Sequence, residues 1–256
     1  MMCISRLSAR VAAVVVLSGL MSLPVCAGEV SAAVASNFSA PMRQIAALFR
    51  KESGHNVKLS FGSTGIFYAQ IREGAPFDVF IAADTATPQR LEDEGLAVTG
   101  SRFVYALGQL VLWSAQPGYV DAHGVVLRNG RYKKLGIADP KLAPYGQAAK
   151  QMLDALKLWH IVKSKLVIGE NITQAWQFAA TGNSELAFVA LSQIMRDGKV
   201  SEGSYWIVPA HLYNPIRQSA ELLTVAKDND AARAFLAFLG SEKAAAVMRS
   251  YGYELP

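Results

Sequence analysis

The chain is nearly devoid of cysteine, and its two cysteines, Cys3 and Cys26, both lie close to the N-terminus. If that segment is removed, no thiol remains for a disulfide, a nucleophile or a cysteine metal site. The fold must then be held by the burial of apolar side chains, for which a composition that is 52% hydrophobic is ample.

Histidine is equally scarce, and the chemistry of most enzymes has few candidates here. The four histidines are scattered between expected loops and helix ends, so neither a metal cluster nor a nucleophile–histidine pair is indicated. Asp78 opens an expected strand and Asp84 precedes a helix start, which favours structural roles for both. Basic runs with interleaved aromatics are also missing, which leaves nucleic-acid binding unsupported. We therefore expect a protein that is no enzyme, needs no cofactor and binds no nucleic acid.

The N-terminus has the pattern of a targeting segment. Arg6 and Arg10 form a basic region, residues 11–21 an apolar region, and residues 25–27 a small-residue cleavage site, so residues 1–27 are predicted to be a removed signal peptide. The apolar run is too short to span a membrane. Residues 23–26 faintly resemble a lipoprotein cleavage box, but Val25 fits it poorly. Loss of the two arginines lowers the net charge from +5 to +3, and we expect a periplasmic protein.

Expected strands and helices alternate along the mature chain, which is the pattern of βαβ units and an α/β fold. Two long extended stretches, 103–114 and 204–215, are long enough to cross between lobes. Residues 215–225 and 231–250 have alanine-rich helical patterns. We therefore predict one lobe from 28–107 plus 213–256, a second from 108–212, and a cleft between them.

The first strand-to-helix turn organises the chain. Residues 30–35 form an unbroken apolar strand of the kind that is buried on both faces. Ser36 and Asn37 follow directly, and Pro41 can lie only in the first turn of a helix. Ligands bind at the carboxyl ends of parallel strands in open α/β sheets, and helix N-termini attract anions.

Three more turns repeat this chemistry. Strands 58–61, 135–138 and 166–169 lead to helix starts near Ser63, Tyr145 and Ile172. None of the four turns contains Lys or Arg. Ordinary helix capping explains each turn alone, but four together predict a site that holds an anion with neutral N–H and O–H donors.

Five segments carry a likeness to a known family, and their order and spacing span the whole mature chain. They are Ala-Ser-Asn at 35–37, Ser-Phe-Gly-Ser-Thr-Gly at 60–65, Gly-Ala-Pro-Phe-Asp-Val-Phe at 74–80, Ala-Asp-Pro at 138–140 with Pro-Tyr-Gly at 144–146, and the strand end at 188–193. Together they resemble the molybdate-binding proteins of bacterial ABC transporters. The resemblance implies a two-lobed periplasmic binding protein fold of type II, in which each lobe is a mostly parallel sheet flanked by helices and two strands form the hinge. It also implies a monomer that closes on molybdate or tungstate and delivers it to a membrane permease.

Carried over by position, the resemblance assigns the ligand oxygens to Ser36, Asn37, Ser63, Tyr145 and Ile172, with no direct coordination of the metal. Some family members supply a tyrosine hydroxyl from the position of Ala190, so Tyr145 is expected to compensate by its hydroxyl, its backbone N–H, or both. Two alternatives stay open at this point. One is a receptor for another oxyanion such as sulfate or phosphate, and the other is an enzyme built on the same scaffold.

Overall fold

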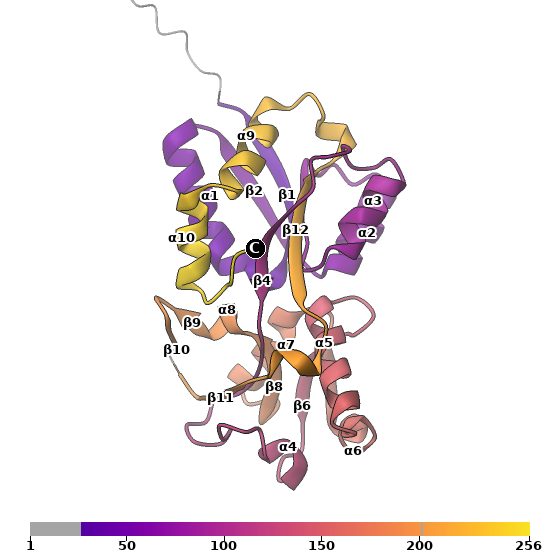
Figure 1. The fold of residues 1–256 in the computed structure, drawn as a ribbon, viewed down its shortest axis with the longest axis vertical. Helices are drawn as coiled ribbons and strands as arrows, with labels where there is room; N and C mark the ends of the chain where they lie inside the picture. The colour runs from indigo at the N-terminus through magenta and orange to yellow at the C-terminus, as the bar shows by residue number, and fades with distance from the viewer. Residues whose placement is uncertain (1–26, 201) are drawn as a thin grey trace, which may run out of the picture.

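The computed structural model describes residues 27–200 and 202–256, so the predicted signal peptide, except Ala27, lies outside the described residues. The chain forms two lobes, each built on a five-stranded sheet covered by helices (Figure 1). The predicted two-lobed α/β fold is therefore confirmed.

The sheet of the first lobe has the strand order β2-β1-β3-β12-β4. Strands β1, β2 and β3 are parallel, whereas β12 runs antiparallel to both β3 and β4, so four strands share one direction and one opposes them. The bounds are β1 Glu29–Ala35, β2 Asn56–Gly62, β3 Val79–Ile81, β4 Phe103–Gly108 and β12 Ile216–Leu222.

The sheet of the second lobe, β11-β5-β8-β6-β7, repeats this arrangement. Here β6, β7 and β8 are parallel and β5 is the strand of opposite direction, paired with β8 and β11. The bounds are β5 Leu110–Ser114, β6 Leu135–Ala138, β7 Leu166–Gly169, β8 Leu186–Ala190 and β11 Ser204–Ile207.

Helices cover both faces of the first sheet. On one face, α1 (Ser39–Ser53), α9 (Asp230–Leu239) and α10 (Glu242–Ser250) bury an apolar cluster that includes Phe38, Met42 and Phe235. On the other face, α2 (Thr64–Arg72) and α3 (Ala86–Asp93) bury a second cluster with Phe67 and Leu91. This sandwiching explains why β1 is apolar on both sides.

The second lobe is layered in the same way. Helices α5 (Pro144–Ala155) and α6 (Trp159–Val162) pack on one face, and α7 (Ile172–Ala180) and α8 (Leu191–Ile194) pack on the other. The remaining elements are η1 Ser36–Phe38, α4 Val126–Asn129, η2 Lys163–Lys165, β9 Met195–Arg196, β10 Lys199–Val200, η3 Ala210–Leu212 and η4 Thr224–Ala226.

Two segments cross between the lobes. The expected strand at 103–114 divides at Gln109 into β4 and β5, which belong to different sheets. The return path runs from β11 through η3 to β12, and the boundaries that we predict for the lobes fall in or next to these two segments. The exact division stays a prediction.

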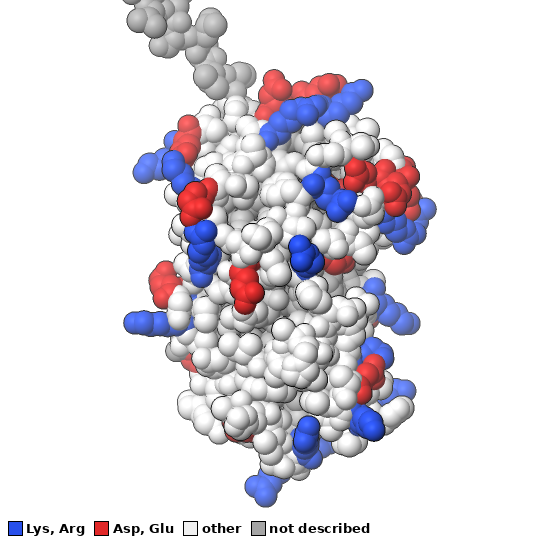
Figure 2. Space-filling view, in the orientation of Figure 1, with Lys and Arg blue, Asp and Glu red and all other residues white. Residues whose placement is uncertain are grey.

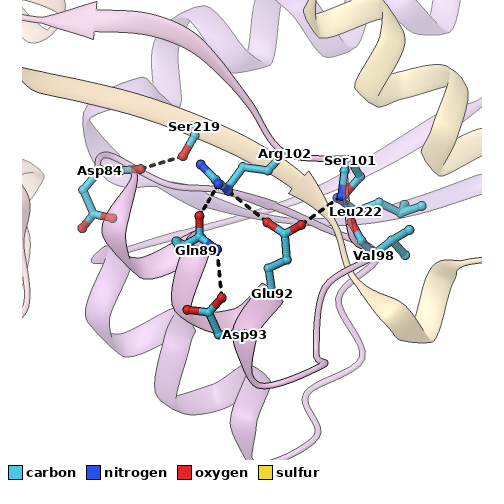
Figure 3. A network of polar contacts seen from close by, with 10 residues as sticks. Asp84, Gln89, Glu92, Asp93, Val98, Ser101, Arg102, Ser219 and Leu222 are labelled. Atoms are coloured by element: carbon cyan, nitrogen blue, oxygen red, sulfur yellow. Dashed lines mark hydrogen bonds and ion pairs between the residues drawn. The ribbon is translucent and has the colours of Figure 1, made fainter.

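The predicted helix at 215–225 is wrong, because β12 occupies most of it and lies between β3 and β4. The segment was misread as a helix because it contains polar residues, which are hydrogen-bonded inside the sheet. In Figure 3, the Ser219 hydroxyl donates to the Asp84 carbonyl at 2.9 Å, and the Leu222 N–H donates to the Ser101 hydroxyl at 3.1 Å. The helical prediction for 231–250 is confirmed, as α9 and α10.

Charged side chains of both signs are interspersed over the face drawn in Figure 2, with no large block of a single sign. Within the described residues, no helix combines the length and the apolar character needed to cross a membrane.

Candidate functional site

A small cavity between the lobes brings together all five residues that the sequence singled out. The cavity is far smaller than the pockets that hold drug-sized ligands, so only a very small ligand can be considered for it. Its lining consists of Ala35, Ser36, Asn37, Gly62, Ser63, Thr64, Ala83, Ala143, Pro144, Tyr145 and Ile172.

The lining comes from the carboxyl ends of strands in both sheets. Ser36 and Asn37 begin η1 directly after β1, and Ser63 is the N-cap of α2 after β2. Tyr145 is the second residue of α5, and Ile172 is the first residue of α7. Since the first N–H groups of a helix have no carbonyl partner inside it, four helix starts bring potential hydrogen-bond donors together here.

No charged side chain contributes to this lining as the structure describes it. Among the acids nearest in sequence, Glu170 is exposed, and Asp139 accepts a hydrogen bond from the N–H of Lys141 at 2.8 Å. Within residues 27–200 and 202–256, no three His, Cys, Asp or Glu side chains are grouped so that they could hold a metal ion. The cavity therefore offers hydrogen-bond donors and helix dipoles in place of ionic partners.

Ser63 carries an unpaired polar atom. The residue is 3% exposed, and its buried hydroxyl has no hydrogen-bond partner among the residues that the structure describes. Leaving a buried hydroxyl unpaired costs about 1–3 kcal/mol. Since Ser63 lines the cavity, a ligand there is the natural partner for its hydroxyl.

Ile172 contributes through its backbone, because the preceding residue directs the helix start. The Asn171 side chain accepts hydrogen bonds from the N–H groups of Thr173 at 3.0 Å and Gln174 at 3.1 Å. This cap uses the second and third N–H groups of α7 and leaves that of Ile172 for the cavity.

The Asn37 side chain is already engaged. Its Nδ2 donates to Gln218 Oε1 at 2.8 Å and to the Tyr253 hydroxyl at 2.9 Å, which uses both amide hydrogens. Asn37 can therefore serve a ligand with its backbone N–H but not with its carboxamide donors.

Tyr145 lines the cavity, but its hydroxyl is held in a polar cluster. The hydroxyl accepts a hydrogen bond from Gln218 Nε2 at 3.2 Å. Burial, with neighbouring tyrosines as a smaller cause, raises the pKa of Tyr145 well above its usual value, so the hydroxyl stays neutral at physiological pH. Because Pro144 has no N–H, Tyr145 also supplies the first backbone donor of α5.

Direct contacts between the lobes surround the cavity. The N–H of Gly65 donates to the Leu142 carbonyl at 2.9 Å, and the Ser192 hydroxyl donates to the Asn37 carbonyl at 2.8 Å. The Thr173 hydroxyl donates to the Ser36 carbonyl at 3.3 Å. The described arrangement is therefore a closed one.

Sequence reasoning missed the residues that support the site. Thr64 lines the cavity while its hydroxyl accepts a hydrogen bond from the N–H of Ala83 at 3.0 Å. Gln218 and Tyr253 lie behind Asn37, but in the sequence they are isolated polar residues far from any of the four turns. Only the tertiary structure brings them to the site.

Comparison with known proteins agrees with the geometry. The family model for bacterial extracellular solute-binding proteins matches residues 30–254. The molybdate-binding protein ModA of Azotobacter vinelandii is 57% identical over 238 residues, which cover 93% of this chain and 94% of that protein. The ModA protein of Rhodobacter capsulatus is 49% identical over 233 residues, or 91% of each chain.

A solved structure supports the same assignment. The periplasmic molybdate-binding protein of Azotobacter vinelandii superposes with a TM-score of 0.86 at 40% identity and covers 89% of this chain and 99% of its own. As its sequence predicts, this chain belongs to the family of bacterial extracellular solute-binding proteins, in the branch that contains the ModA proteins of these two bacteria.

Proposed function

We propose that this chain binds molybdate in the cavity between its lobes and presents it to the permease of an ABC importer. The observation that carries the proposal is the buried, unpaired Ser63 hydroxyl in a cavity whose lining is uncharged. The names of the relatives at 57% and 49% identity identify molybdate as the first ligand to test.

The donor set suits a fully ionised tetrahedral oxyanion. Such an ion presents only acceptor oxygens, and the Ser36 and Ser63 hydroxyls and the backbone N–H groups of Asn37, Tyr145 and Ile172 can all donate to it. Charge-assisted hydrogen bonds of this kind are about twice as strong as neutral ones. The dipoles of the helices that begin at the cavity add a fixed positive potential.

The same set disfavours phosphate. A phosphate that carries a proton needs an acceptor, and the lining has no carboxylate among its members. Sulfate has the same charge and oxygen arrangement as molybdate, so discrimination between them must come from size. Tungstate has a geometry close to that of molybdate, and we propose that it binds as well.

The proposal includes a location and a destination. Family membership and the predicted signal peptide support export to the periplasm. Closure of the two lobes around one ion would give the permease a surface that differs between free and loaded protein.

Calorimetric titration of residues 28–256 with molybdate, tungstate, sulfate and phosphate tests the function. We expect molybdate and tungstate to bind at least a hundredfold more tightly than sulfate, and phosphate to bind no better than sulfate. Equal affinity for sulfate and molybdate would support a general oxyanion receptor instead, and no binding of any of the four anions would remove the proposal.

A further inference from the structure

Six buried polar residues form a connected cluster beside the cavity, and most of them were not among the predicted site residues. Each is at most 5% exposed. They come from both lobes, from both crossing segments and from the C-terminal segment. We call them the hinge cluster: Asn37, Tyr105, Tyr145, Ser192, Gln218 and Tyr253.

Gln218 is the centre of the hinge cluster. Its Oε1 accepts hydrogen bonds from Asn37 Nδ2 at 2.8 Å and from the Tyr105 hydroxyl at 3.0 Å. Its Nε2 donates to the Tyr145 hydroxyl at 3.2 Å. One carboxamide on crossing strand β12 thus joins a cavity residue of the first lobe to a cavity residue of the second.

The backbone around Gln218 is shaped for these bonds. Gln218 pairs with Ala106 and Ser219 pairs with Val104, so Tyr105 is an extra residue on β4. Such a bulge redirects the side chains beside it. At the end of β4, a Cβ on Gly108 would lie 2.0 Å from the Tyr145 hydroxyl and 2.5 Å from Gln218 Nε2, so a larger residue there would displace both groups.

Tyr253 adds a second link between the lobes. Its hydroxyl accepts from Asn37 Nδ2 at 2.9 Å and bonds the Ser192 hydroxyl, also at 2.9 Å. The Asn37 side chain is therefore linked through Tyr253 to Ser192 and through Gln218 to Tyr145, and the Ser192 hydroxyl also donates directly to the Asn37 carbonyl.

We infer that Gln218 is a positioning residue that couples the crossing strands to ligand binding and favours the closed arrangement of the lobes. The inference rests on the proposed function. Gln218 touches Asn37 and Tyr145 rather than the cavity itself, since it is not part of the lining. Rotation of the lobes apart would separate Tyr145 from Asn37 and leave part of the carboxamide unpaired, so the bonds of Gln218 stabilise closure selectively.

Three variants separate this role from a general contribution to stability. Gln218→Met keeps the length of the side chain but removes its hydrogen bonds, and Tyr253→Phe removes one hydroxyl from the second link. Gln218→Glu keeps the shape but adds a charge that is lost on protonation. Gln70→Glu is the matched control, since Gln70 is exposed on α2 and gains the same charge. Circular dichroism and thermal melting establish that each variant is folded.

The groups that face Gln218 make the pH profile of Gln218→Glu informative. They are Tyr105 of β4, Tyr145 of α5 and Tyr253, with burial raising the pKa of all three, that of Tyr253 to about 12. Asp84 lies close enough to raise the pKa of Tyr105 further. In Gln218→Glu the new carboxyl would lie among neutral hydroxyls, so burial should raise its pKa and let it regain its proton in mild acid.

The test measures molybdate affinity by calorimetry and lobe closure by small-angle scattering. We expect a loss of affinity of at least tenfold in Gln218→Met and at least threefold in Tyr253→Phe, with a smaller change in scattering on addition of molybdate. Gln218→Glu should bind molybdate at least a hundredfold more weakly than wild type at pH 8, and its affinity should recover to within tenfold of wild type at pH 5.5. The affinities of wild type and Gln70→Glu should change little between these pH values.

Wild-type affinity and closure in Gln218→Met, or a flat pH profile in Gln218→Glu, would overturn the inference while leaving the proposed function intact. Failure of the wild-type protein to bind molybdate would instead overturn the proposed function and this inference with it.

Discussion

Ser63 and Ser184 have the same chemistry in different places. Both are serines at most 3% exposed, and the hydroxyl of each lacks a hydrogen-bond partner in the described part of the chain. Ser63 lines the cavity, whereas Ser184 lies outside it, in the segment between α7 and β8. Comparison of the two serines separates the contribution of a buried hydroxyl to ligand binding from its cost to the stability of the free protein.

Ser63→Ala should weaken molybdate binding tenfold to a hundredfold without destabilising the free protein. Loss of one charge-assisted hydrogen bond costs about 1.5–3 kcal/mol, which corresponds to roughly a tenfold to hundredfold loss of affinity. Removal of an unpaired polar atom should keep or raise the melting temperature. Calorimetry and thermal melting measure both effects. Ser184→Ala should also keep or raise the melting temperature, but it should bind molybdate as tightly as wild type. Equal affinities of wild type, Ser63→Ala and Ser184→Ala would mean that the site is misplaced.

Glu221 is the second residue whose burial has a measurable consequence. It is 0% exposed on β12, and within residues 27–200 and 202–256 neither of its carboxylate oxygens has a hydrogen-bond partner. Burial and the nearby Glu92 raise its pKa to about 8, while Arg102 opposes them. Arg102 is itself engaged with Glu92 at 3.2 Å, as Figure 3 shows, so it leaves Glu221 largely uncompensated.

Stability should therefore fall as pH rises through the range in which Glu221 loses its proton. The unfolded chain releases this proton near pH 4.5, and the folded chain releases it only near pH 8. The contribution of protonated Glu221 to the free energy of unfolding is therefore complete below pH 4.5 and is lost as the pH rises to 8. Glu221→Gln should flatten this part of the profile and stabilise the protein at pH 8 by a few kcal/mol. Chemical denaturation from pH 5 to pH 8.5 measures it. Glu73→Gln, an exposed change of the same kind, should leave the wild-type slope, and a slope that survives in Glu221→Gln would refute the assignment.

The cavity residues were predictable from the sequence because strand ends, small polar residues and helix starts coincide there. The directions of their side chains were not. Asn37 looks like a ligand donor in the sequence, yet its carboxamide is held by Gln218 and Tyr253, which lie 181 and 216 residues away along the chain.

Among the elements, helix α7 shows how the N-cap residue determines which backbone N–H groups stay available to the cavity. Its cap, Asn171, uses the N–H groups of Thr173 and Gln174 and leaves the first N–H of the helix, that of the cavity residue Ile172, uncapped. The same side chain also lines a neighbouring groove, beside Thr173 and Gln174.

Substitution of this cap should affect binding through the backbone. Asn171→Ala should destabilise the helix start by about 1 kcal/mol and weaken molybdate binding severalfold, since the Ile172 donor is no longer fixed. Asn171→Ser restores a neutral cap and should restore most of the affinity. Asn171→Asp caps equally well but places a negative charge near the anion, so it should bind more weakly than Asn171→Ser in calorimetry. Equal binding by Asn171→Ala and wild type would contradict this role for α7.

Strand β12 is the element whose type could not be predicted from the sequence. Alternation of strands and helices was readable, because most strands are apolar runs. In β12, however, Gln218, Ser219 and Glu221 are all buried. A central strand with three buried polar residues has no apolar signature, and the partners of Gln218 and Ser219 come from η1, β4, α5 and the segment before α3.

For the whole molecule, ligand binding should shift the population of the lobes toward closure. Donors from both lobes can reach one small ion only when the lobes are together. Small-angle scattering should show a smaller radius of gyration with saturating molybdate than without. Ser63→Ala at the same molybdate concentration should show less of this change. Identical scattering for free and bound wild type, with the free form no more compact than the described structure, would contradict closure.

The electrostatics of the whole molecule predict an affinity that depends weakly on pH and salt. The described lining has no charged member, and its one titratable side chain, Tyr145, has a raised pKa. Fixed dipoles inside a closed cavity are screened less than exposed ion pairs. Calorimetry from pH 6 to pH 8.5 and at several salt concentrations should give a nearly constant dissociation constant. Arg43, which lines the neighbouring groove, provides the control, because Arg43→Gln should change affinity less than threefold. A clear inflection between pH 6 and pH 8 would mean that an ionisable side chain reaches the ligand.

The position of β12 in the first sheet also constrains the order in which the molecule can be assembled. Strand β12 separates β3 from β4, yet it follows all the strands of the second lobe in the chain. During synthesis, which proceeds from the N-terminus, β4 has no neighbour in its own sheet until residues 216–222 emerge. The second lobe can complete its sheet at residue 207, before the first lobe completes its own. The lobe that begins the chain is thus the last to complete its sheet.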